Sequence, residues 1–401
     1  MQHVVVIGAG QAGASCVAKL RNGGFEGQIT LIGAEPCPPY QRPPLSKGYL
    51  LGEMTLERLF LRPEAFYADQ GITLKTNCRV TTIDPEARVL STTDGEIVYD
   101  ELVLTTGSVP RRLPAAMGGA LEGVFTVRDL ADVDAMAPRF VKGAKVLIVG
   151  GGYIGLEAAA VAAKLGLEVT LVEMADRILQ RVAAPETSDY FRALHEQHGV
   201  TLREGVGLDR LLGDTQVTGA RLSDGAEIAA DFVITGVGIE PDVMLAEAAG
   251  IEIENGIKVD AQGRTNVPGI WAAGDCTSFP YRGGRIRLES VPNAIDQAEI
   301  VAENILGAGK EYVATPWFWS DQYDVKLQIA GLNAGYDRVV SRRGDGSASF
   351  WYYLGETLLA VDAANDPRAY MVGKRLIEAG KSPDPALIAD PATDLKALLR
   401  P

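Results

Sequence analysis

Short runs of consecutive apolar residues, each ending in a glycine-rich turn, recur along this chain. Val4 to Ile7 and Val146 to Val149 are two such runs, and their unbroken apolar character is typical of parallel strands that are buried on both faces. Each is followed by a G-x-G-x-x-G turn, a helical segment and a second apolar run, Ile29 to Ile32 or Val169 to Val172. The pattern predicts two strand–turn–helix–strand units.

The two glycine turns have the spacing that a dinucleotide requires. The first glycine permits a tight turn, the second lets the backbone approach a pyrophosphate, and the third allows helix and strand to pack closely. The helix start offers N–H groups and a positive dipole end to phosphates, and an acid about 20 residues further on can bond a ribose diol. The residues are Gly8, Gly10, Ala12, Gly13 and Glu35 in the first unit, and Gly150, Gly152, Tyr153, Ile154, Gly155 and Glu173 in the second.

Two complete units predict two dinucleotides bound at once, and therefore electron transfer between them. The alternative is that one unit is a degenerate relic of the fold. Both units keep three glycines and the acid, which favours two working sites, but these residues do not say which dinucleotide each unit takes.

An apolar run that ends in a glycine turn precedes the second unit, and a similar run follows it. Residues 72–104 alternate strand-like runs with turns and end in a buried strand that leads into Gly107 of a T-T-G turn. Residues 232–242 form a similar run ending in a G-V-G turn, and a helix is expected to begin near Pro292 and to end near Ile305.

The pattern of apolar and polar residues changes from about residue 313. Strand-like runs alternate there, and two of them, residues 349–354 and 357–364, predict a hairpin through Gly355. A helix is expected over residues 367–379, so this region is interpreted as a separate α+β domain.

Composition narrows the function classes. The 401 residues carry a formal net charge of −14 with a pI near 4.8, which argues against nucleic acid and anionic membranes as partners. No apolar run of about 18 residues lacks a charge, and the first apolar run is already a dinucleotide strand, so neither a membrane span nor a signal peptide is expected.

The four cysteines, Cys16, Cys37, Cys78 and Cys276, show no metal-type spacing. We therefore predict no metal site and no structural disulfide, which is typical of a reducing, cytoplasmic compartment.

A proline-rich loop, Pro36 to Tyr49, follows the first unit and carries Arg42 and Lys47. Proline fixes φ and restricts its neighbours, so the loop is stiff. It is either a solvated linker or, as its stiffness favours, a support that holds a cation at a site.

Together these motifs resemble a known family. The two glycine turns, the P-Y-Q-R-P-P-L-S-K loop, the T-T-G and G-V-G turns and an A-A-G-D segment occur in the same order in FAD-dependent pyridine-nucleotide oxidoreductases. The segments R-L-E-S-V-P-N-A-I-D-Q-A and W-F-W-S-D-Q-Y-D-V-K-L-Q-I-A-G are similar to those of NADH:ferredoxin reductases of oxygenase systems. The resemblance covers essentially the whole chain.

The resemblance implies a cofactor for each unit. The first unit would hold FAD and the second would hold NAD, with Glu157, Glu173 and Gly238 among its contacts. The further FAD contacts that it implies are Arg42, Lys47, Val80, Gly107, Arg128, Asp275 and Val291. It also implies that Trp319 lies beside the isoalloxazine, and that Lys47 and Glu157 form an ion pair within about 4 Å of each other near flavin N5.

The implied fold is α/β, with two Rossmann-like dinucleotide-binding domains and a C-terminal α+β domain. Because the A-A-G-D segment belongs with the first unit, the NAD domain would be inserted into a discontinuous FAD domain. The expected domains are residues 1–110 with 240–312 for FAD, 111–239 for NAD and 313–401 for the C-terminal domain.

The implied activity is electron transfer from NADH through FAD to a 2Fe-2S ferredoxin, which feeds a haem monooxygenase or a ring-hydroxylating dioxygenase. One alternative is a cysteine-based NADH oxidase, peroxidase or disulfide reductase of the same fold, but the loop Pro43 to Gly48 has no cysteine. Another is a flavoprotein that resembles apoptosis-inducing factor. Monomer and homodimer both stay open.

Two specificity features are predicted. NADH is expected over NADPH because Glu173 would repel a 2′-phosphate, although Arg177 and Arg181 could partly compensate. A local basic patch must guide an acidic ferredoxin to this acidic chain, and the candidates for that patch are Arg282, Arg285, Arg287 and Lys326.

Overall fold

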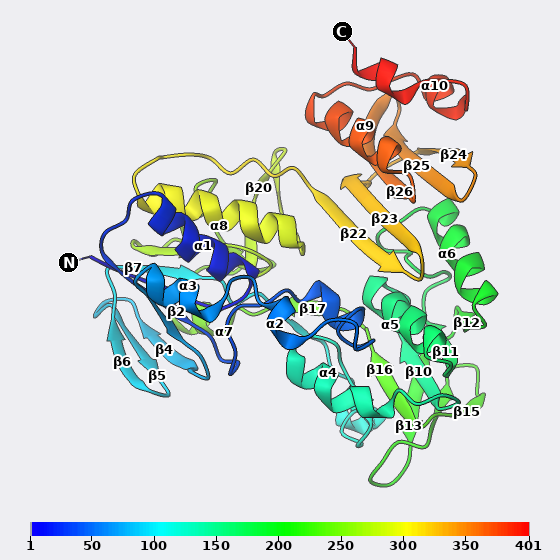
Figure 1. Cartoon of the computed structure of the whole chain (residues 1–401), viewed down its shortest axis with the longest axis horizontal. Helices are drawn as coiled ribbons and strands as arrows, with labels where there is room; N and C mark the ends of the chain where they lie inside the picture. The colour runs from blue at the N-terminus through cyan, green and yellow to red at the C-terminus, as the bar shows by residue number, and fades with distance from the viewer. Residues whose placement is uncertain (1, 401) are drawn as a thin grey trace. The chain divides into compact units, whose positions relative to one another are not determined.

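The computed structural model describes residues 2–400, which divide into two compact units (Figure 1). The first comprises the residues up to Arg42 with Thr55–Val109 and Ile239–Pro316, and the second comprises Pro43–Met54, Pro110–Gly238 and the residues from Trp317. The expected boundaries of three domains stay a prediction.

The first unit is built on a five-stranded parallel sheet. The strand order is β19 (Ile270–Ala272), β7 (Glu101–Leu104), β1 (His3–Ile7), β2 (Gln28–Ile32) and β3 (Ile72–Lys75). Strands β1 and β2 pair in register, with Val4 opposite Ile29. The predicted parallel strands of the first glycine unit are confirmed.

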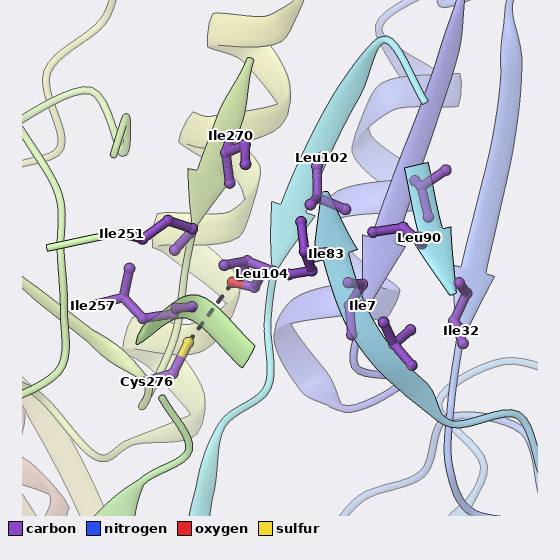
Figure 2. Close-up of a cluster of buried hydrophobic side chains, with 14 of the residues drawn as sticks. Ile7, Ile32, Ile83, Leu90, Leu102, Leu104, Ile251, Ile257, Ile270 and Cys276 are labelled. Carbon is purple, nitrogen blue, oxygen red and sulfur yellow. Dashed lines mark hydrogen bonds between the residues drawn. The ribbon is translucent and has the colours of Figure 1, made fainter. Parts of the chain in front are cut away.

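Both faces of this sheet are buried. Successive side chains of a strand point to opposite faces, and each face packs into its own core cluster. Val5, Ile7, Leu102 and Leu104 belong to one core cluster, whereas Val4, Val6 and Val103 belong to another. Figure 2 shows the first cluster, in which Cys276 donates through its thiol to the Leu104 carbonyl at 3.7 Å. The unbroken apolar runs follow from this burial on both sides.

Helices α1 (Gln11–Asn22) and α8 (Val291–Ile305) pack against each other. Ser290 caps α8 by accepting from the Asn293 N–H, and Pro292 lies in its first turn, where a missing N–H costs nothing. The remaining elements of this unit are β4 (Val80–Asp84), β5 (Val89–Thr92), β6 (Gly95–Val98), β8 (Ser108–Pro110), β17 (Ile239–Pro241), β18 (Ile257–Lys258), β20 (Thr277–Tyr281), β21 (Gly284–Ile286), α2 (Leu56–Leu59), α3 (Glu64–Asp69) and α7 (Met244–Ala248).

The second unit contains a further five-stranded parallel sheet. Its order is β12 (Thr201–Glu204), β11 (Glu168–Glu173), β10 (Lys145–Val149), β16 (Phe232–Thr235) and β9 (Val124–Phe125). Helix α5 (Tyr153–Lys164) connects β10 to β11, as the second glycine unit predicts. The other elements here are α4 (Leu130–Met136), α6 (Pro185–Gln197), β13 (Leu208–Leu212), β14 (Gly219–Leu222), β15 (Glu227–Ala229) and the 3-10 helix η1 (Pro43–Ser46).

An antiparallel sheet, two helices and a 3-10 helix, η4 (Leu395–Leu399), complete the second unit. The strand order is β22 (Trp317–Gln322), β23 (Val325–Gly331), β26 (Thr357–Ala364), β25 (Ser347–Leu354) and β24 (Arg338–Gly344). The predicted hairpin is β25–β26, and the predicted helix is α9 (Pro367–Glu378), followed by α10 (Pro385–Ala389). The α/β fold class with a C-terminal α+β part is therefore confirmed. Among residues 2–400, no helix combines the length and apolarity that a membrane crossing needs.

Candidate dinucleotide sites and the Lys47–Glu157 pair

The first glycine turn separates two kinds of glycine. Gly8 has φ +111°, and a Cβ there would lie 2.1 Å from the Thr105 carbonyl oxygen; a Cβ on Gly13 would lie 2.0 Å from the Gly8 carbonyl oxygen. A Cβ on Gly10, in contrast, would meet no atom of residues 2–400 within 4 Å. The fold therefore requires glycine at Gly8 and Gly13, whereas the open space at Gly10 fits the close approach of a pyrophosphate.

The second turn repeats this geometry. A Cβ would lie 2.4 Å from the Gly236 carbonyl oxygen at Gly150, and 2.1 Å from the Gly150 carbonyl oxygen at Gly155. At Gly152, the N-cap of α5, the described chain again leaves open space. Both turns thus leave a helix N-terminus accessible to phosphate, which argues against the interpretation of one unit as a relic.

The two acids lie where the sequence pattern expects them. Glu173 ends β11, and its carboxylate accepts from the backbone N–H of Gly151 at 2.7 Å and of Ala175 at 2.8 Å. It is therefore held beside the glycine turn. Glu35 accepts from the Tyr40 hydroxyl and from Arg42, each at 2.5 Å. The proline-rich loop thus holds the Arg42 cation against Glu35, the acid of the first unit.

Other residues implied for FAD meet at one edge of the first sheet. Gly8, Gly107 and Asp275 follow β1, β7 and β19, which are adjacent and parallel, so their carboxyl ends share an edge. The Ser108 hydroxyl donates to Asp275 at 3.2 Å. Such an edge is where ligands bind in open α/β sheets.

The remaining implied contacts are dispersed over both units. In the first unit, Val80 begins β4 and Val291 begins α8. Arg128 and Trp319 belong to the second unit together with Lys47. The backbone N–H of Arg128 donates to Asp132, and the Trp319 ring is tilted against Trp317 with centroids 5.5 Å apart. The FAD contacts of these residues stay predictions.

The predicted Lys47–Glu157 ion pair is present within the second unit. Lys47 Nζ lies 3.1 Å from Glu157 Oε1 and 3.4 Å from Asp321. Glu157 is buried, and it also accepts from the hydroxyls of Ser46 and Ser320, each at 2.7 Å. Burial raises the pKa of Glu157, whereas Lys47 and the two hydroxyls lower it, so the pKa lies above its usual range.

Sequence reasoning missed Ser46, Ser320 and Asp321 as partners of this pair. Ser320 lies in β22, where it is buried in a run that is otherwise rich in tryptophan and phenylalanine. A hydroxyl at an inward position of an aromatic strand needs a hydrogen-bond partner. That position was the one available signal.

Comparison with known proteins identifies the family. The model of the pyridine nucleotide-disulphide oxidoreductases matches residues 2–298, and that of the reductase C-terminal domain matches residues 317–399. This chain belongs to the pyridine nucleotide-disulphide oxidoreductase family. It is an oxidoreductase that uses FAD and a nicotinamide dinucleotide.

Full-length relatives agree with this assignment. A ferredoxin–NAD(P)+ reductase from a Sphingomonas species is 45% identical, over 99% of this chain and 98% of the relative. Putidaredoxin reductase from Pseudomonas putida is 38% identical over 99% and 96%. The crystal structure of a covalent putidaredoxin reductase–putidaredoxin complex has a TM-score of 0.96 at 38% identity, covering 99% of this chain and 98% of that chain.

The cysteines of this oxidoreductase are poorly placed for thiol chemistry. Burial raises the pKa of Cys16 to about 12 and the pKa of Cys276 to about 11, and a thiolate is the reactive form. Cys78 is also buried, and Cys37 precedes η1. In η1 itself, the hydroxyl of Ser46 contacts Glu157.

The candidate basic residues differ in their contacts. Arg285 donates to the Val259 carbonyl and contacts that of Ser278, and Arg287 pairs with Glu289. Arg282 and Lys326 are exposed. Arg285 and Arg287 are therefore engaged within the first unit. Arg282 of the first unit and Lys326 of the second are the better candidates, each for a basic patch on its own unit.

Proposed function

We propose that this oxidoreductase passes electrons from NADH through FAD to a 2Fe-2S ferredoxin that feeds an oxygenase. The observation that carries the proposal is the Lys47–Glu157 pair, beside which residues 43–48 provide a serine and a lysine but no cysteine. Without a cysteine in residues 43–48, this segment offers no thiol to receive the electrons, which favours their transfer to a second protein.

The relatives support a ferredoxin as that protein. They are named as ferredoxin and putidaredoxin reductases, and one solved structure holds putidaredoxin reductase covalently joined to putidaredoxin. No observation on this chain favours the cysteine-based alternative, because two of its buried cysteines have raised thiol pKa values.

The residues of this chain have distinct tasks in the proposed reaction. FAD, when bound, supplies the chemistry that converts a hydride into single electrons. Gly10 and the N-terminus of α1 would hold its pyrophosphate, and Glu35 would bond its adenosine ribose. Gly152 and Glu173 would do the same for NADH. Lys47, whose positive charge is balanced by Glu157, would provide a hydrogen-bond donor in a fixed position beside the flavin.

The test compares electron acceptors. The FAD-loaded enzyme is given NADH and, in separate reactions, an artificial one-electron acceptor, hydrogen peroxide and coenzyme A disulfide. We expect turnover with the one-electron acceptor to exceed that with peroxide or disulfide by at least about 100-fold, or about 2.7 kcal/mol in barrier. Faster turnover with peroxide or disulfide would refute the proposal.

A further inference from the structure

We propose that Tyr323, His195, Gln322 and Ser320 form a directional hydrogen-bond chain that holds Glu157 as a carboxylate opposite Lys47. The chain lies entirely within the second unit. The functional meaning of this inference rests on the proposed role of the Lys47–Glu157 pair, but its test does not depend on ferredoxin.

The contacts run without a gap from the edge of the unit to the ion pair. The Tyr323 hydroxyl lies 3.0 Å from His195 Nδ1, and His195 Nε2 lies 2.8 Å from Gln322 Oε1. Gln322 Nε2 donates to Ser320 Oγ at 3.3 Å, and Ser320 donates to Glu157 at 2.7 Å. Three elements, α6, β22 and α5, are joined in this way.

The chemistry of each group fixes the direction of the chain. A carboxylate only accepts, so the single Ser320 proton goes to Glu157. Ser320 then accepts from the Gln322 amide, whose oxygen must accept from a protonated His195 Nε2. His195 Nδ1 is left with its lone pair, and it accepts the Tyr323 proton. A carboxylate at Glu157 therefore requires a proton on Nε2 of His195, and in the neutral ring this is the Nε2–H tautomer.

Burial restricts the alternatives to one. Ser320, Gln322 and His195 are fully buried, so an unsatisfied group in the chain costs about 1–3 kcal/mol. With a neutral histidine ring, the arrangement that satisfies every group along the chain after Glu157 takes up a proton reverses every bond. Glu157 is then protonated and donates to Ser320, the Gln322 amide is turned over, and His195 is protonated on Nδ1. A proton on the other carboxylate oxygen, Oε2, would instead face Ser46, whose hydroxyl would then have to turn to the Pro43 carbonyl at 3.5 Å, a much longer contact. The ionisation of Glu157 and the tautomer of His195 are thus coupled.

The outer end of the chain is held in place. Tyr323 has φ +56° in the turn between β22 and β23, a conformation that costs a residue with a bulky side chain strain energy. Its ring stacks on His198 with centroids 3.6 Å apart. These contacts keep the hydroxyl directed at His195, and burial lowers the pKa of His195 to about 4, which favours the neutral ring.

The test reads the tautomer directly. The chain contains only three histidines, so nitrogen-15 labelling of histidine gives a simple spectrum, in which the His195 signals are assigned by their loss in a His195→Gln variant. In the FAD-loaded wild-type enzyme at neutral pH we expect His195 to be neutral and protonated on Nε2. A ring that carries its proton on Nδ1, or on both nitrogens, would overturn the proposal.

A distant substitution then tests the coupling. Lys47→Met removes the cation opposite Glu157, so the buried carboxyl should take up a proton and His195 should change to the Nδ1–H tautomer. The matched control is Lys164→Met, which breaks the exposed ion pair with Glu53 and should leave His195 unchanged. An unchanged tautomer in a folded Lys47→Met variant would refute the coupling.

A second variant separates coupling from a general structural effect. Gln322→Leu interrupts the chain, so Lys47→Met should no longer change the His195 tautomer in the double variant. If the tautomer still responds, the coupling follows another route and the proposal fails. Should Gln322→Leu not fold, Gln322→Met provides the same interruption with a flexible side chain.

Discussion

Gly10 and Gly152 are the residues at which the chain most clearly leaves room for a ligand. Their neighbours Gly8, Gly13, Gly150 and Gly155 would bring a Cβ against the backbone, whereas these two would not. Steric crowding by the fold gives no reason for glycine at either position beyond the modest preference of an N-cap for glycine over alanine, and a dinucleotide does.

The cofactor assignment of Gly10 can be tested apart from folding. Gly10→Ala should lower the free energy of unfolding of the FAD-free protein by about 1 kcal/mol or less, the usual cost at an N-cap. It should weaken FAD binding at least about tenfold, or about 1.4 kcal/mol. Gly13→Ala is the contrasting variant, with about 1–3 kcal/mol lost from overpacking. Unchanged FAD affinity in Gly10→Ala would refute the assignment. The measurements are chemical denaturation and FAD titration.

The preference for NADH follows from Glu173. Its carboxylate is held beside the glycine turn of the second unit. Arg177, which could bind a 2′-phosphate, already donates to the Ser188 hydroxyl at 2.6 Å. We expect kcat/KM for NADH to exceed that for NADPH at least about tenfold, and Glu173→Gln to narrow the ratio. Comparable values in the wild type would contradict this.

At the scale of elements, Asp362 joins three parts of the second unit. It lies in β26, fully buried, and accepts from Thr187 of α6 and Tyr352 of β25. Burial raises its pKa to about 6, while the two hydroxyls lower it. The folded chain therefore binds a proton at Asp362 more tightly than the unfolded chain does.

This raised pKa predicts how stability depends on pH. The contribution of Asp362 is fully present below the pKa of the unfolded chain, near 3.8, and is lost as pH rises through about 6. Relative to Asp362→Asn, the wild type should lose about 3 kcal/mol of unfolding free energy between these limits, at about 1.4 kcal/mol per pKa unit. Thr187→Val should raise the pKa further. Chemical denaturation over this pH range would refute the prediction if wild type and Asp362→Asn change in parallel.

The elements were predictable from the sequence, and part of the site was not. The apolar runs of β1 and β10 specify buried parallel strands because both faces of their sheets are covered. Lys47 was placed opposite Glu157 only through the family resemblance. Ser320 and Asp362 depend on contacts between residues more than 100 positions apart, which local periodicity does not encode.

At the scale of the whole molecule, the net charge of −14 must oppose an acidic ferredoxin, so a local basic patch has to guide it. Arg282→Glu in the first unit and Lys326→Glu in the second, made separately, each test one candidate position. At least one of them should raise KM for ferredoxin severalfold and flatten its dependence on salt, while NADH oxidation with an artificial acceptor stays unchanged. Arg210→Glu makes the same change in net charge elsewhere and serves as the control, and effects of both variants no larger than that of the control would show that only overall charge matters.

We propose that electrons from NADH leave this enzyme one at a time for a ferredoxin. The most direct measurement is an anaerobic titration of a limiting amount of NADH into catalytic enzyme and excess 2Fe-2S ferredoxins from the same genome. We predict that one of them is reduced at two molecules per NADH, because a hydride carries two electrons and the cluster accepts one. NADH consumption without reduction of any ferredoxin would contradict the account.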